Sequence, residues 1–410
     1  VIGSVDDVSG TFYNPGAVAQ ASDLAFAVST DVFEYSSISL EDGGGSGVDL
    51  GTATSGLRPS LVAGTIERGL LGGGGILAYS ALTRTRGTQD LAGAVFLTAE
   101  DLPPAATLDD VVGSAEFTGR YSDFWAGLTY SQALGAHVGV GVTWYGAVRS
   151  QNRQEQSTAT FIDNGGSGLS DIDNASGRYT AFRTLFKIGG FFQAGSVTGG
   201  ATLTTPSIHI TGSGELGVNE SLVGADTTAL LAGIQTDLPA QYKSPLSIGG
   251  GLAWQVGPAR LHGSLEWFDG IDPYVVIQGE EIRAQEPESR TEVLDAVHEQ
   301  TEALNWALGA EYQLSDTFTG YLSYYRDNST LDDDIDRAGL SIIPIDINNL
   351  TVGTDFVVRS ARLTLGLGYG WGSQVDRELT DLLREESEAF QATYVYRSLR
   401  LLFGFEIGVN

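Results

Sequence analysis

The stretch that decides the fold is Leu246–Trp267, which reads LSIGGGLAWQVGPARLHGSLEW. In its first half, large apolar residues alternate with small or polar ones, and Gly257–Pro258 separates this half from a second alternating half. Period-two alternation places successive side chains on opposite faces of a strand. The stretch therefore predicts an antiparallel hairpin with one bulky apolar face and one small or polar face.

The same alternation recurs in 124–130, 138–144 and 306–314. A soluble sandwich also alternates, but two features favour a membrane. The small face is rich in Gly, Ser, Thr and Ala and carries charges such as Glu266 and Glu311, which a lumen tolerates. Aromatic residues also gather near the predicted strand ends, as they do at bilayer interfaces. These residues are Trp144, Trp254, Trp267, Trp306, Tyr312, Tyr324, Tyr369 and Trp371.

Short and long connections alternate along the chain. Short turns are predicted near 67–72, 133–136, 193–196, 257–258, 314–317 and 359–361. Long polar loops are predicted near 41–56, 86–121, 151–178, 214–240, 271–303, 328–346 and 373–388. This asymmetry is typical of outer-membrane barrels. The sequence predicts an all-β fold, a transmembrane antiparallel β-barrel of about fourteen strands with both chain ends on the periplasmic side.

Composition narrows the class further. No apolar run is long enough for a membrane-spanning helix. The net charge is -29, which disfavours a nucleic-acid partner. The chain has no cysteine, which fits an oxidising compartment. It begins at Val1 without a basic and apolar leader, so we expect a signal peptide to have been removed.

Three segments leave a local question open. The acidic run 332–336 is interpreted as a solvated loop, with divalent-cation binding as the alternative. The segments 293–304 and 379–383 have apolar residues at helical spacing and predict short helices at the outer mouth. In the last segment, 388–409, the apolar residues change parity at Arg397–Ser398. A β-bulge in one long strand is preferred there over a turn that would add a fifteenth strand.

Catalytic and metal chemistry find little support. Four histidines and no cysteine make a zinc site improbable. His262 and Glu266 lie on one strand face, so both are predicted to face the lumen, as is Glu311. A hydrolase would need a nucleophile and an oxyanion hole beside His262, and the sequence shows neither. We expect no enzymatic activity and no cofactor.

The segment Tyr13–Ala17 precedes the first predicted strand, which starts at Leu24. Asn14-Pro15-Gly16 is a turn former, because Pro fixes φ and Gly permits positive φ. Residues 1–12 are too irregular for a lipid-facing strand and must lie in the lumen or the periplasm. The predicted division is a hatch or plug segment at 1–22 and a barrel at 23–410.

This segment resembles the Asn-Pro-Ala signature of the long-chain fatty-acid transporter (FadL-type) family, with Gly16 in place of Ala. Three further pieces agree in order along almost the whole chain. They are 205–212, the stretch from Leu238-Pro239 to Trp267, and the closing strand 394–409.

The resemblance implies a plugged fourteen-stranded barrel that passes hydrophobic molecules. It also implies a lateral opening at a kink in the third strand, beside the Asn14-Pro15-Gly16 turn. That strand opens with Gly72, Gly73, Gly74 and Gly75, a run that weakens strand pairing. It is interpreted either as a flexible periplasmic turn or as a distortion that helps to form the lateral gate.

The function expected is passive uptake of long-chain fatty acids or hydrocarbons across the outer membrane, with release through the barrel wall. The expected partners are a hydrophobic small molecule, outer-membrane lipid and lipopolysaccharide. The alternative is a structural barrel subunit or carrier in an outer-membrane assembly, with a stable protein partner and no ligand-sized apolar cavity in its lumen.

Overall fold

The computed structural model describes residues 2–5, 7–20, 24–42, 49–70, 74–98, 108–163, 168–224, 228–287, 290–330, 345–359, 361–375 and 393–409. Almost all of this part of the chain is strand. The N-terminal half holds α1 (Gly10–Tyr13), η1 (Ala17–Gln20), β1 (Leu24–Glu41), β2 (Leu50–Leu70), β3 (Gly75–Thr98), β4 (Leu108–Ala133), β5 (Val138–Asp163), β6 (Gly168–Ala194) and β7 (Val197–Thr204).

The C-terminal half continues with shorter strands. They are β8 (Ile208–Val223), β9 (Thr228–Pro239), β10 (Ser247–Val256), β11 (Ala259–Phe268), β12 (Ile271–Ile277), β13 (Glu281–Arg283), β14 (Thr291–Val293), β15 (Ala296–Gln300), β16 (Ala303–Ser315), β17 (Phe318–Asp327), β18 (Ile347–Val358), β19 (Ala361–Val375) and β20 (Thr393–Val409).

The strands close into a barrel of fourteen antiparallel strands. The ring runs from β1 through β2, β3, β4 and β5 to β6, and returns through β7, β10, β11, β16, β17, β18 and β19 to β20, which pairs with β1. The predicted architecture and strand number are confirmed. Closure gives each wall strand two neighbours, which a sheet in lipid requires.

Several ring strands are interrupted where the sequence places proline. Pro206 separates β7 from β8, and Pro239 and Pro245 flank the break between β9 and β10. Proline has no backbone N–H to give to a ladder. The wall nonetheless stays hydrogen-bonded across the break, because the Ser207 N–H donates to the Ser244 carbonyl at 3.1 Å, although its register against β6 shifts between Thr204 and Ile208.

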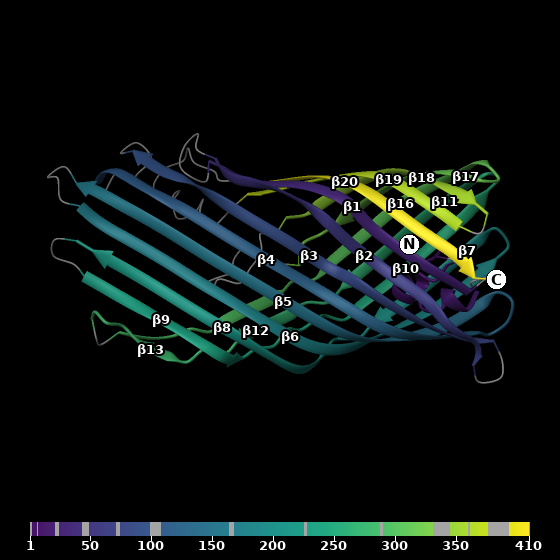
Figure 1. Ribbon diagram of the computed structural model, residues 1–410, viewed down its shortest axis with the longest axis horizontal. Coiled ribbons are helices and arrows are strands. Elements are labelled where there is room, and N and C mark those ends of the chain that lie inside the picture. The colour runs from purple at the N-terminus through teal and green to yellow at the C-terminus, as the bar shows by residue number, and fades with distance from the viewer. Residues whose placement is uncertain are drawn as a thin grey trace.

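The barrel is cut obliquely. Its two ends differ, with short turns at the end where both chain ends lie and long strands at the other (Figure 1). β3, β4, β5 and β6 have 24 to 27 residues, whereas β16, β17 and β18 have 10 to 13. One side of the wall therefore rises well beyond the other at the long-strand end.

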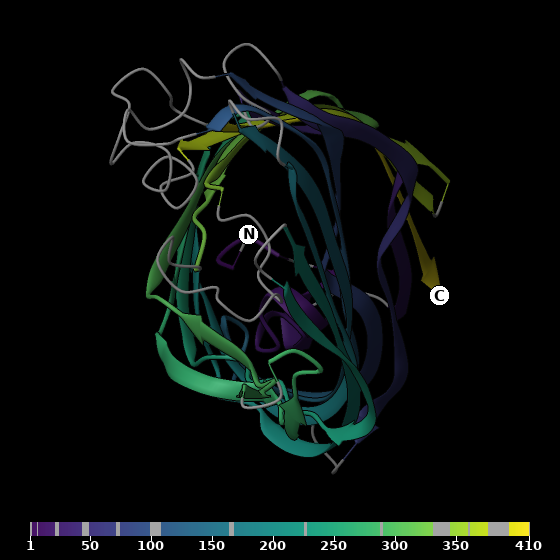
Figure 2. The ribbon, with the colours of Figure 1, turned by 90° about the vertical axis from the view of Figure 1, so that its left-hand side faces the viewer.

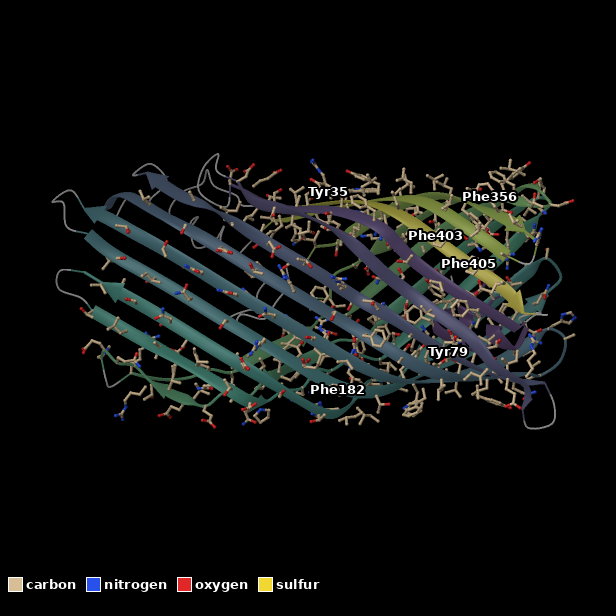
Figure 3. The ribbon with its side chains drawn as sticks, in the orientation of Figure 1. Tyr35, Tyr79, Phe182, Phe356, Phe403 and Phe405 are labelled. Atoms are coloured by element: carbon tan, nitrogen blue, oxygen red, sulfur yellow. The ribbon has the colours of Figure 1, made fainter. Side chains whose placement is uncertain are left out.

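An apolar belt surrounds the barrel near the short-turn end. On β4, β5 and β6 the outward row Phe124, Val148 and Phe182 is followed one step higher by Ser122, Ser150 and Thr180. Exposed aliphatic and aromatic side chains fill the strands below this boundary (Figure 3). Typical members are Leu128, Val140, Val142, Trp144, Ile188, Leu252, Leu265, Leu308, Val352, Leu367 and Leu401. The belt marks the height of the bilayer core.

An aromatic group marks the upper rim of the short wall. Trp306 and Tyr324 have ring centroids 5.2 Å apart, Tyr324 and Trp371 are 6.3 Å apart, and Tyr369 and Trp371 are 5.6 Å apart. These residues come from β16, β17 and β19. They form a continuous patch of the kind that anchors a barrel at a membrane interface.

The predicted long loops are corrected in extent. The segments 86–98, 108–121, 151–163, 168–178 and most of 214–239 are strand and continue the ladders beyond the belt. Their outward faces are polar because they stand above the lipid, and this polarity made them resemble loops. The predicted short turns near 133–136, 193–196, 257–258 and 314–317 are confirmed. Residues 67–70 are strand, whereas 71–73 and 360 lie outside the described residues; the strands on either side of these positions pair with each other.

The predicted helix at 293–304 is wrong. The ladder of β11 and β16 continues upward as β12 and β15, with Ile271 opposite Gln300, and β13 and β14 form the hairpin above. Strand pairing with the wall outweighs the local helical spacing here. The helix predicted at 379–383 and the acidic run 332–336 lie outside the described residues.

The closing segment is one strand, as predicted, but the β-bulge predicted at Arg397–Ser398 is absent. β20 pairs with β19 without a register shift from Thr393 to Ile407. The apolar residues change side because Tyr394 and Tyr396 share the inner face with Ser398 and Arg400, whereas Leu399 and Leu401 face outward. The bulge lies across the seam in β1, between Asp31 and Phe33.

The N-terminal segment lies inside the barrel (Figure 2). Ile2, Val8, Thr11, Asn14 and Val18 are buried there against the wall. Its helices are single turns, and within the described ranges none is long and apolar enough to cross a membrane. The segment fills the lumen at the level of the apolar belt.

The belt makes a prediction for two outward positions on β5. A lysine in place of Val142 would lie within the hydrocarbon and should lower the free energy of unfolding by about 2–4 kcal/mol. A lysine in place of Asn152, above the boundary, should change it by less than about 1 kcal/mol. Urea-dependent folding into lipid vesicles measures both, and equal effects would show that the belt does not face lipid.

Candidate functional site

The lumen contains a cavity of about 560 Å³ above the N-terminal segment. Its lining comes from β1 to β7, from the break between β9 and β10, and from the strands of the short wall. A cavity of this size accommodates a small organic molecule. The N-terminal segment forms its floor, and the barrel strands form its wall.

The floor is held by Asn14, whose side chain is fully buried. Its Nδ2 donates to the Ile2 carbonyl and to the Gly190 carbonyl, both at 3.0 Å, and its Oδ1 accepts from the Gly16 N–H at 3.1 Å. One amide thus closes the turn, ties down the start of the segment and fastens both to β6. The turn predicted at Asn14-Pro15-Gly16 lies against the wall inside the lumen.

Hydroxyl groups on β4 and β5 donate to two further carbonyls of the segment. The Thr11 carbonyl accepts from Thr143 Oγ1 at 2.9 Å and from the Tyr145 hydroxyl at 2.7 Å. The Pro15 carbonyl accepts from Ser131 Oγ at 2.6 Å. The small polar face that predicted a lumen is therefore the surface that satisfies an irregular backbone.

Two glycines give the segment room. A Cβ atom at Gly141 would overlap the Pro15 carbonyl, and one at Gly189 would overlap Asn14 Oδ1 and the Pro15 ring. The alternating glycines seen in the sequence thus form the seat of the N-terminal segment, since any side chain at these two positions would displace it.

Phe12 forms the top of the floor. Its ring lies 6.4 Å from that of Trp125, edge to face, and Trp125 lies 5.1 Å from Tyr145. The Arg84 guanidinium carbon lies 5.7 Å from the Phe12 centroid, and Lys187 Nζ lies 4.9 Å from it. The N-terminal segment therefore meets the cavity through an aromatic ring flanked by two cations.

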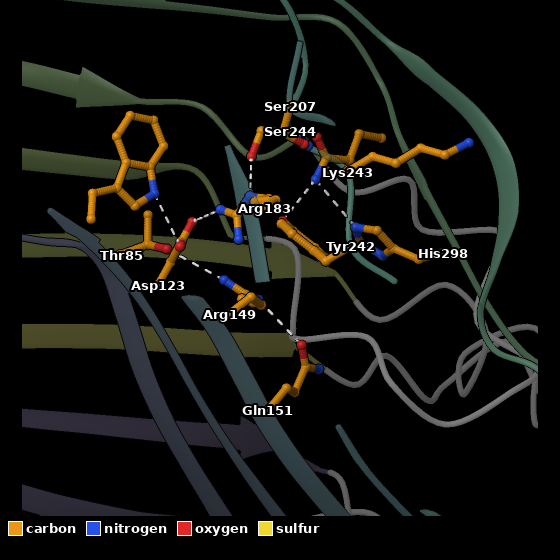
Figure 4. Close-up of polar contacts among 12 residues, drawn as sticks. Thr85, Asp123, Arg149, Gln151, Arg183, Ser207, Tyr242, Lys243, Ser244 and His298 are labelled. Atoms are coloured by element: carbon orange, nitrogen blue, oxygen red, sulfur yellow. Dashed lines mark hydrogen bonds and ion pairs between the residues drawn. The ribbon is translucent and has the colours of Figure 1, made fainter. Parts of the chain in front are cut away.

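Tyr242 dominates the opposite side of the cavity. It projects from the β9–β10 break to lie between two guanidinium groups, 4.7 Å from Arg149 and 5.0 Å from Arg183 (Figure 4). It also stacks with Tyr179 at 6.5 Å and receives a hydrogen bond from Gln300 Nε2 at 3.1 Å. The break thus places an aromatic ring in the lumen.

Asp123 connects the two sides. Its Oδ1 accepts from Trp125 Nε1 at 3.0 Å, and its Oδ2 forms an ion pair with the fully buried Arg183. Arg149 donates instead to Thr85 Oγ1 at 3.3 Å and to Gln151 Oε1 at 3.2 Å. One carboxylate therefore stands among two buried guanidinium groups.

Above the cavity, Tyr274 of β12 packs in one cluster with Tyr179 and Tyr242. The Lys243 N–H donates to the Tyr274 hydroxyl at 3.1 Å, and Lys243 Nζ lies 4.4 Å from the ring. Burial raises the pKa of this hydroxyl above its ordinary range.

The residues predicted to face the lumen do so, but in two separate places. His262 Nε2 lies 2.8 Å from Glu311 Oε1, with the histidine buried. Glu266 lines the cavity and accepts from Ser247 Oγ at 2.9 Å. No hydroxyl is hydrogen-bonded to His262 among the described residues.

The predicted gate residues are placed only in part. Gly72 and Gly73 lie outside the described residues. Gly74 is in the turn that joins β2 to β3, with φ +83°, and Gly75 begins β3 opposite Leu70 and Gln132. Gly74 therefore lies in the turn, and Gly75 lies at its border with β3, at the short-turn end of the barrel.

The wall loses its pairing at a different point of β2 and β3. Their ladder runs from Gly75–Leu70 up to Leu82–Leu61 and stops there, although the described strands continue to Thr98 and Leu50. Pro59, which cannot donate a backbone hydrogen bond, lies two residues beyond Leu61 on β2. We call this point the β2–β3 fork.

Irregularities in the neighbouring ladders surround the β2–β3 fork. β1 and β2 shift register above Ser29–Leu61 and again between Asp31 and Glu34, and β3 shifts against β4 at Arg84. Ser60, Thr83 and Arg84, which flank the fork, all line the cavity. The cavity therefore reaches the wall where the wall is least paired.

Sequence reasoning missed the cationic and aromatic lining. Arg84, Arg149, Arg183 and Tyr242 stand in segments that looked like loop or loop border, so nothing marked them as inward. The inward parity of 117–125 and 149–153 would have marked Arg149 and the aromatic residues of β4, had these polar stretches been interpreted as strand.

Comparison with solved structures shows which known proteins share this fold. No family model matches the chain, and no curated protein matches it by sequence. The Pseudomonas putida toluene transporter TodX matches with a TM-score of 0.63 at 11% identity, over 100% of this chain and 95% of that one. The CymD monoaromatic hydrocarbon channel matches with 0.58 at 12% identity, over 100% and 95%. A Pseudomonas aeruginosa FadL homologue matches with 0.55 at 11% identity, over 100% and 96%. The resemblance to the FadL-type family is confirmed at the level of the fold.

The glycine seat is tested with an introduced cysteine, because the chain has none of its own. Ala17→Cys, at a fully buried position, should react slowly with a thiol reagent. Adding Gly189→Val should speed the reaction by about tenfold or more, as expected if the segment loses at least 1.4 kcal/mol of packing.

Gly146→Val is the matched control, because a Cβ atom there meets nothing within 4 Å. It should leave the reaction rate unchanged. Equal rates in the two valine variants would show that Gly189 does not seat the segment. Heat-dependent mobility on gels confirms that both barrels are folded.

Proposed function

We propose that this barrel is a passive outer-membrane channel for hydrophobic small molecules, with lateral release through its wall. The observation that carries the proposal is the cavity itself. It lies inside a closed, apolar-belted barrel, its lining sets seven aromatic rings among polar and charged side chains, and it reaches the β2–β3 fork.

The driving force is burial of apolar surface. Each Å² removed from water contributes about 25 cal/mol, so a ligand that buries about 200 Å² against Phe12, Trp125 and Phe268 gains about 5 kcal/mol. That is enough for capture from dilute solution without a cofactor or an energy source.

A straight route through the barrel is obstructed by the N-terminal segment. Asn14, Pro15 and Thr11 are bonded to β4, β5 and β6 at the level of the belt. Opening it would break several buried hydrogen bonds, each worth about 1 kcal/mol net. The β2–β3 fork needs no such cost, because its backbone pairing is already absent.

The fork lies at the upper border of the lipid belt. Leu82 pairs with Trp125, one residue from the outward Phe124, and Phe124 belongs to the last apolar row of β4. A hydrophobic molecule leaving the cavity there enters the bilayer without crossing water. This supports lateral release.

Residues 1–22 act in this proposal as a hatch that closes the axial route, and 23–410 form the barrel. Asn14, Pro15 and Gly16 hold the hatch shut. The glycine run 72–75 gives the β2–β3 hairpin the freedom to widen the fork, since Gly74 already occupies a left-handed turn.

The solved structures support the ligand class. TodX is described as a toluene transporter and CymD as a monoaromatic hydrocarbon channel. The closed barrel and its belt imply an outer-membrane location, with lipid at the belt and lipopolysaccharide around the polar wall above it. A structural subunit would not need the enclosed cavity, so the channel is favoured over that role.

A disulfide across the fork tests lateral release. Ser60 and Thr83 directly follow the last paired row, so Ser60→Cys with Thr83→Cys would extend the β2–β3 ladder by one covalent step. Oxidation should slow uptake of a labelled fatty acid or toluene into cells by about tenfold or more, as for a barrier raised by 1.4 kcal/mol. Reductant should restore it.

The matched control is Ser323→Cys with Thr351→Cys, which are directly paired in the regular ladder of β17 and β18. Oxidation of this pair should not change uptake. If the fork disulfide forms and uptake is unaffected, lateral release at this position is refuted.

A further inference from the structure

The cavity has a charge balance opposite to that of the chain. The whole protein carries 51 acidic and 22 basic residues. Five Lys or Arg side chains nevertheless line the cavity, against four carboxylates, and the buried Arg183 stands directly behind it. Cations concentrated in the lumen of so acidic a protein attract anions.

Arg84 is a cation that lies among the aromatic rings of the lining. Its guanidinium carbon lies 5.7 Å from Phe12, 5.9 Å from Trp125 and 5.8 Å from Phe268. Within the described residues no acceptor is hydrogen-bonded to it. Aromatic contacts engage the faces of a guanidinium, and its in-plane N–H fork remains open to a carboxylate.

Arg149 and Arg183 supply a second observation. Their side chains are 6% and 0% exposed. In the described structure, Arg149 Nε and Arg183 Nη1 are buried without a hydrogen-bond partner. Asp123 forms an ion pair with Arg183 but not with Arg149, so the group around Tyr242 retains a buried positive charge, and buried donors of this kind require an acceptor.

Aromatic rings and arginines alternate down the inner wall toward this site. Phe117, Tyr121 and Trp125 share one face of β4 at intervals of four residues. Arg153 lies 4.6 Å from Phe117, and Arg149 lies 4.4 Å from Tyr121. Arg84, near Trp125, is the lowest of these arginines. The ring and arginine pairs therefore form a row that runs from the outer mouth to the cavity.

The lining favours flat ligands over flexible chains. Seven of its residues are Phe, Tyr or Trp, whereas its aliphatic side chains are Ile38, Ile345 and Ile347 apart from one proline. Aromatic rings prefer stacked or edge-to-face contact with other rings. The apolar part of the ligand is therefore expected to be aromatic.

We propose that the lumen selects planar aromatic carboxylates, with the ring among Phe12, Trp125 and Phe268 and the carboxylate on the N–H fork of Arg84, close to the buried guanidinium groups of Arg149 and Arg183. This rests on the proposed channel function and specifies its ligand. The alternation of Phe117, Tyr121 and Trp125 with Arg153 and Arg149 guides the ligand to the site, because each step offers both a ring face and a cation.

The test compares three probes on the purified full-length protein. 2-Naphthoate carries both features, naphthalene lacks the charge, and decanoate lacks the rings. Calorimetric titration should give 2-naphthoate the tightest binding, by about tenfold or more over either other probe, which corresponds to one charge-assisted hydrogen bond or ring contact.

Arg84→Gln should weaken 2-naphthoate by about tenfold or more and leave naphthalene within about twofold. Arg84→Lys keeps the charge without the planar fork and should lie between. Arg178→Gln is the matched control. Among the described residues, Arg178 is bonded to Glu215 alone, on the outer wall, where it holds the pKa of that carboxyl below its usual range. Its loss should not affect any probe.

The outcomes separate this inference from the channel itself. If naphthalene or decanoate is taken up but 2-naphthoate binds no better than they do, the carboxylate selection is refuted and the channel stands. If Arg84→Gln binds 2-naphthoate as tightly as the unmodified protein, the assigned site is refuted. If none of the probes enters cells through the protein, the channel function itself fails.

Discussion

The structure depends on the pairing of backbone groups in a medium that offers them no water. Each unpaired N–H or C=O in hydrocarbon costs several kcal/mol, so fourteen strands close on one another through β1 and β20. Backbone hydrogen bonds cross the wall even where proline interrupts a strand. The β2–β3 ladder ends only at the upper border of the apolar belt, where an unpaired edge can be solvated.

The same constraint explains the inner surface. An irregular N-terminal segment can lie inside the barrel only if its polar groups are satisfied. The hydroxyls of Thr143, Tyr145 and Ser131 and the amide of Asn14 satisfy them, while Gly141 and Gly189 leave the space. The features that make the lumen tolerate this segment also restrict passage along the axis. They leave the cavity open toward the fork.

Much of the fold was predictable because a strand that spans lipid alternates large apolar residues with small or polar ones. This alternation and the short turns predicted the strands of the belt and the closed ring. The alternation is lost above the lipid, where both faces of a strand are polar, and 86–98 and 151–163 therefore resembled loops. Prediction from the sequence also fails where tertiary pairing overrides local spacing, as in 291–300.

The candidate site was predictable only where it carries a local signature. Asn14-Pro15-Gly16 is a turn in any context, and its resemblance to a family signature pointed to the lumen. Arg84, Arg149, Arg183 and Tyr242 come together from strands far apart in the sequence, through inward parity and a break in one wall strand. A site assembled in this way leaves no local pattern in the sequence. The large negative net charge of the chain also gives no sign of a cationic lumen.

The central claim is that hydrophobic molecules enter the lumen and leave through the wall between β2 and β3. A crystal structure with a brominated aromatic ligand tests it most directly, because anomalous scattering locates each bromine. We predict peaks inside the cavity between Phe12 and Tyr242 and a second site at the β2–β3 fork beside Ser60 and Thr83. Peaks confined to the outer face of the apolar belt, with an empty cavity, would contradict the account.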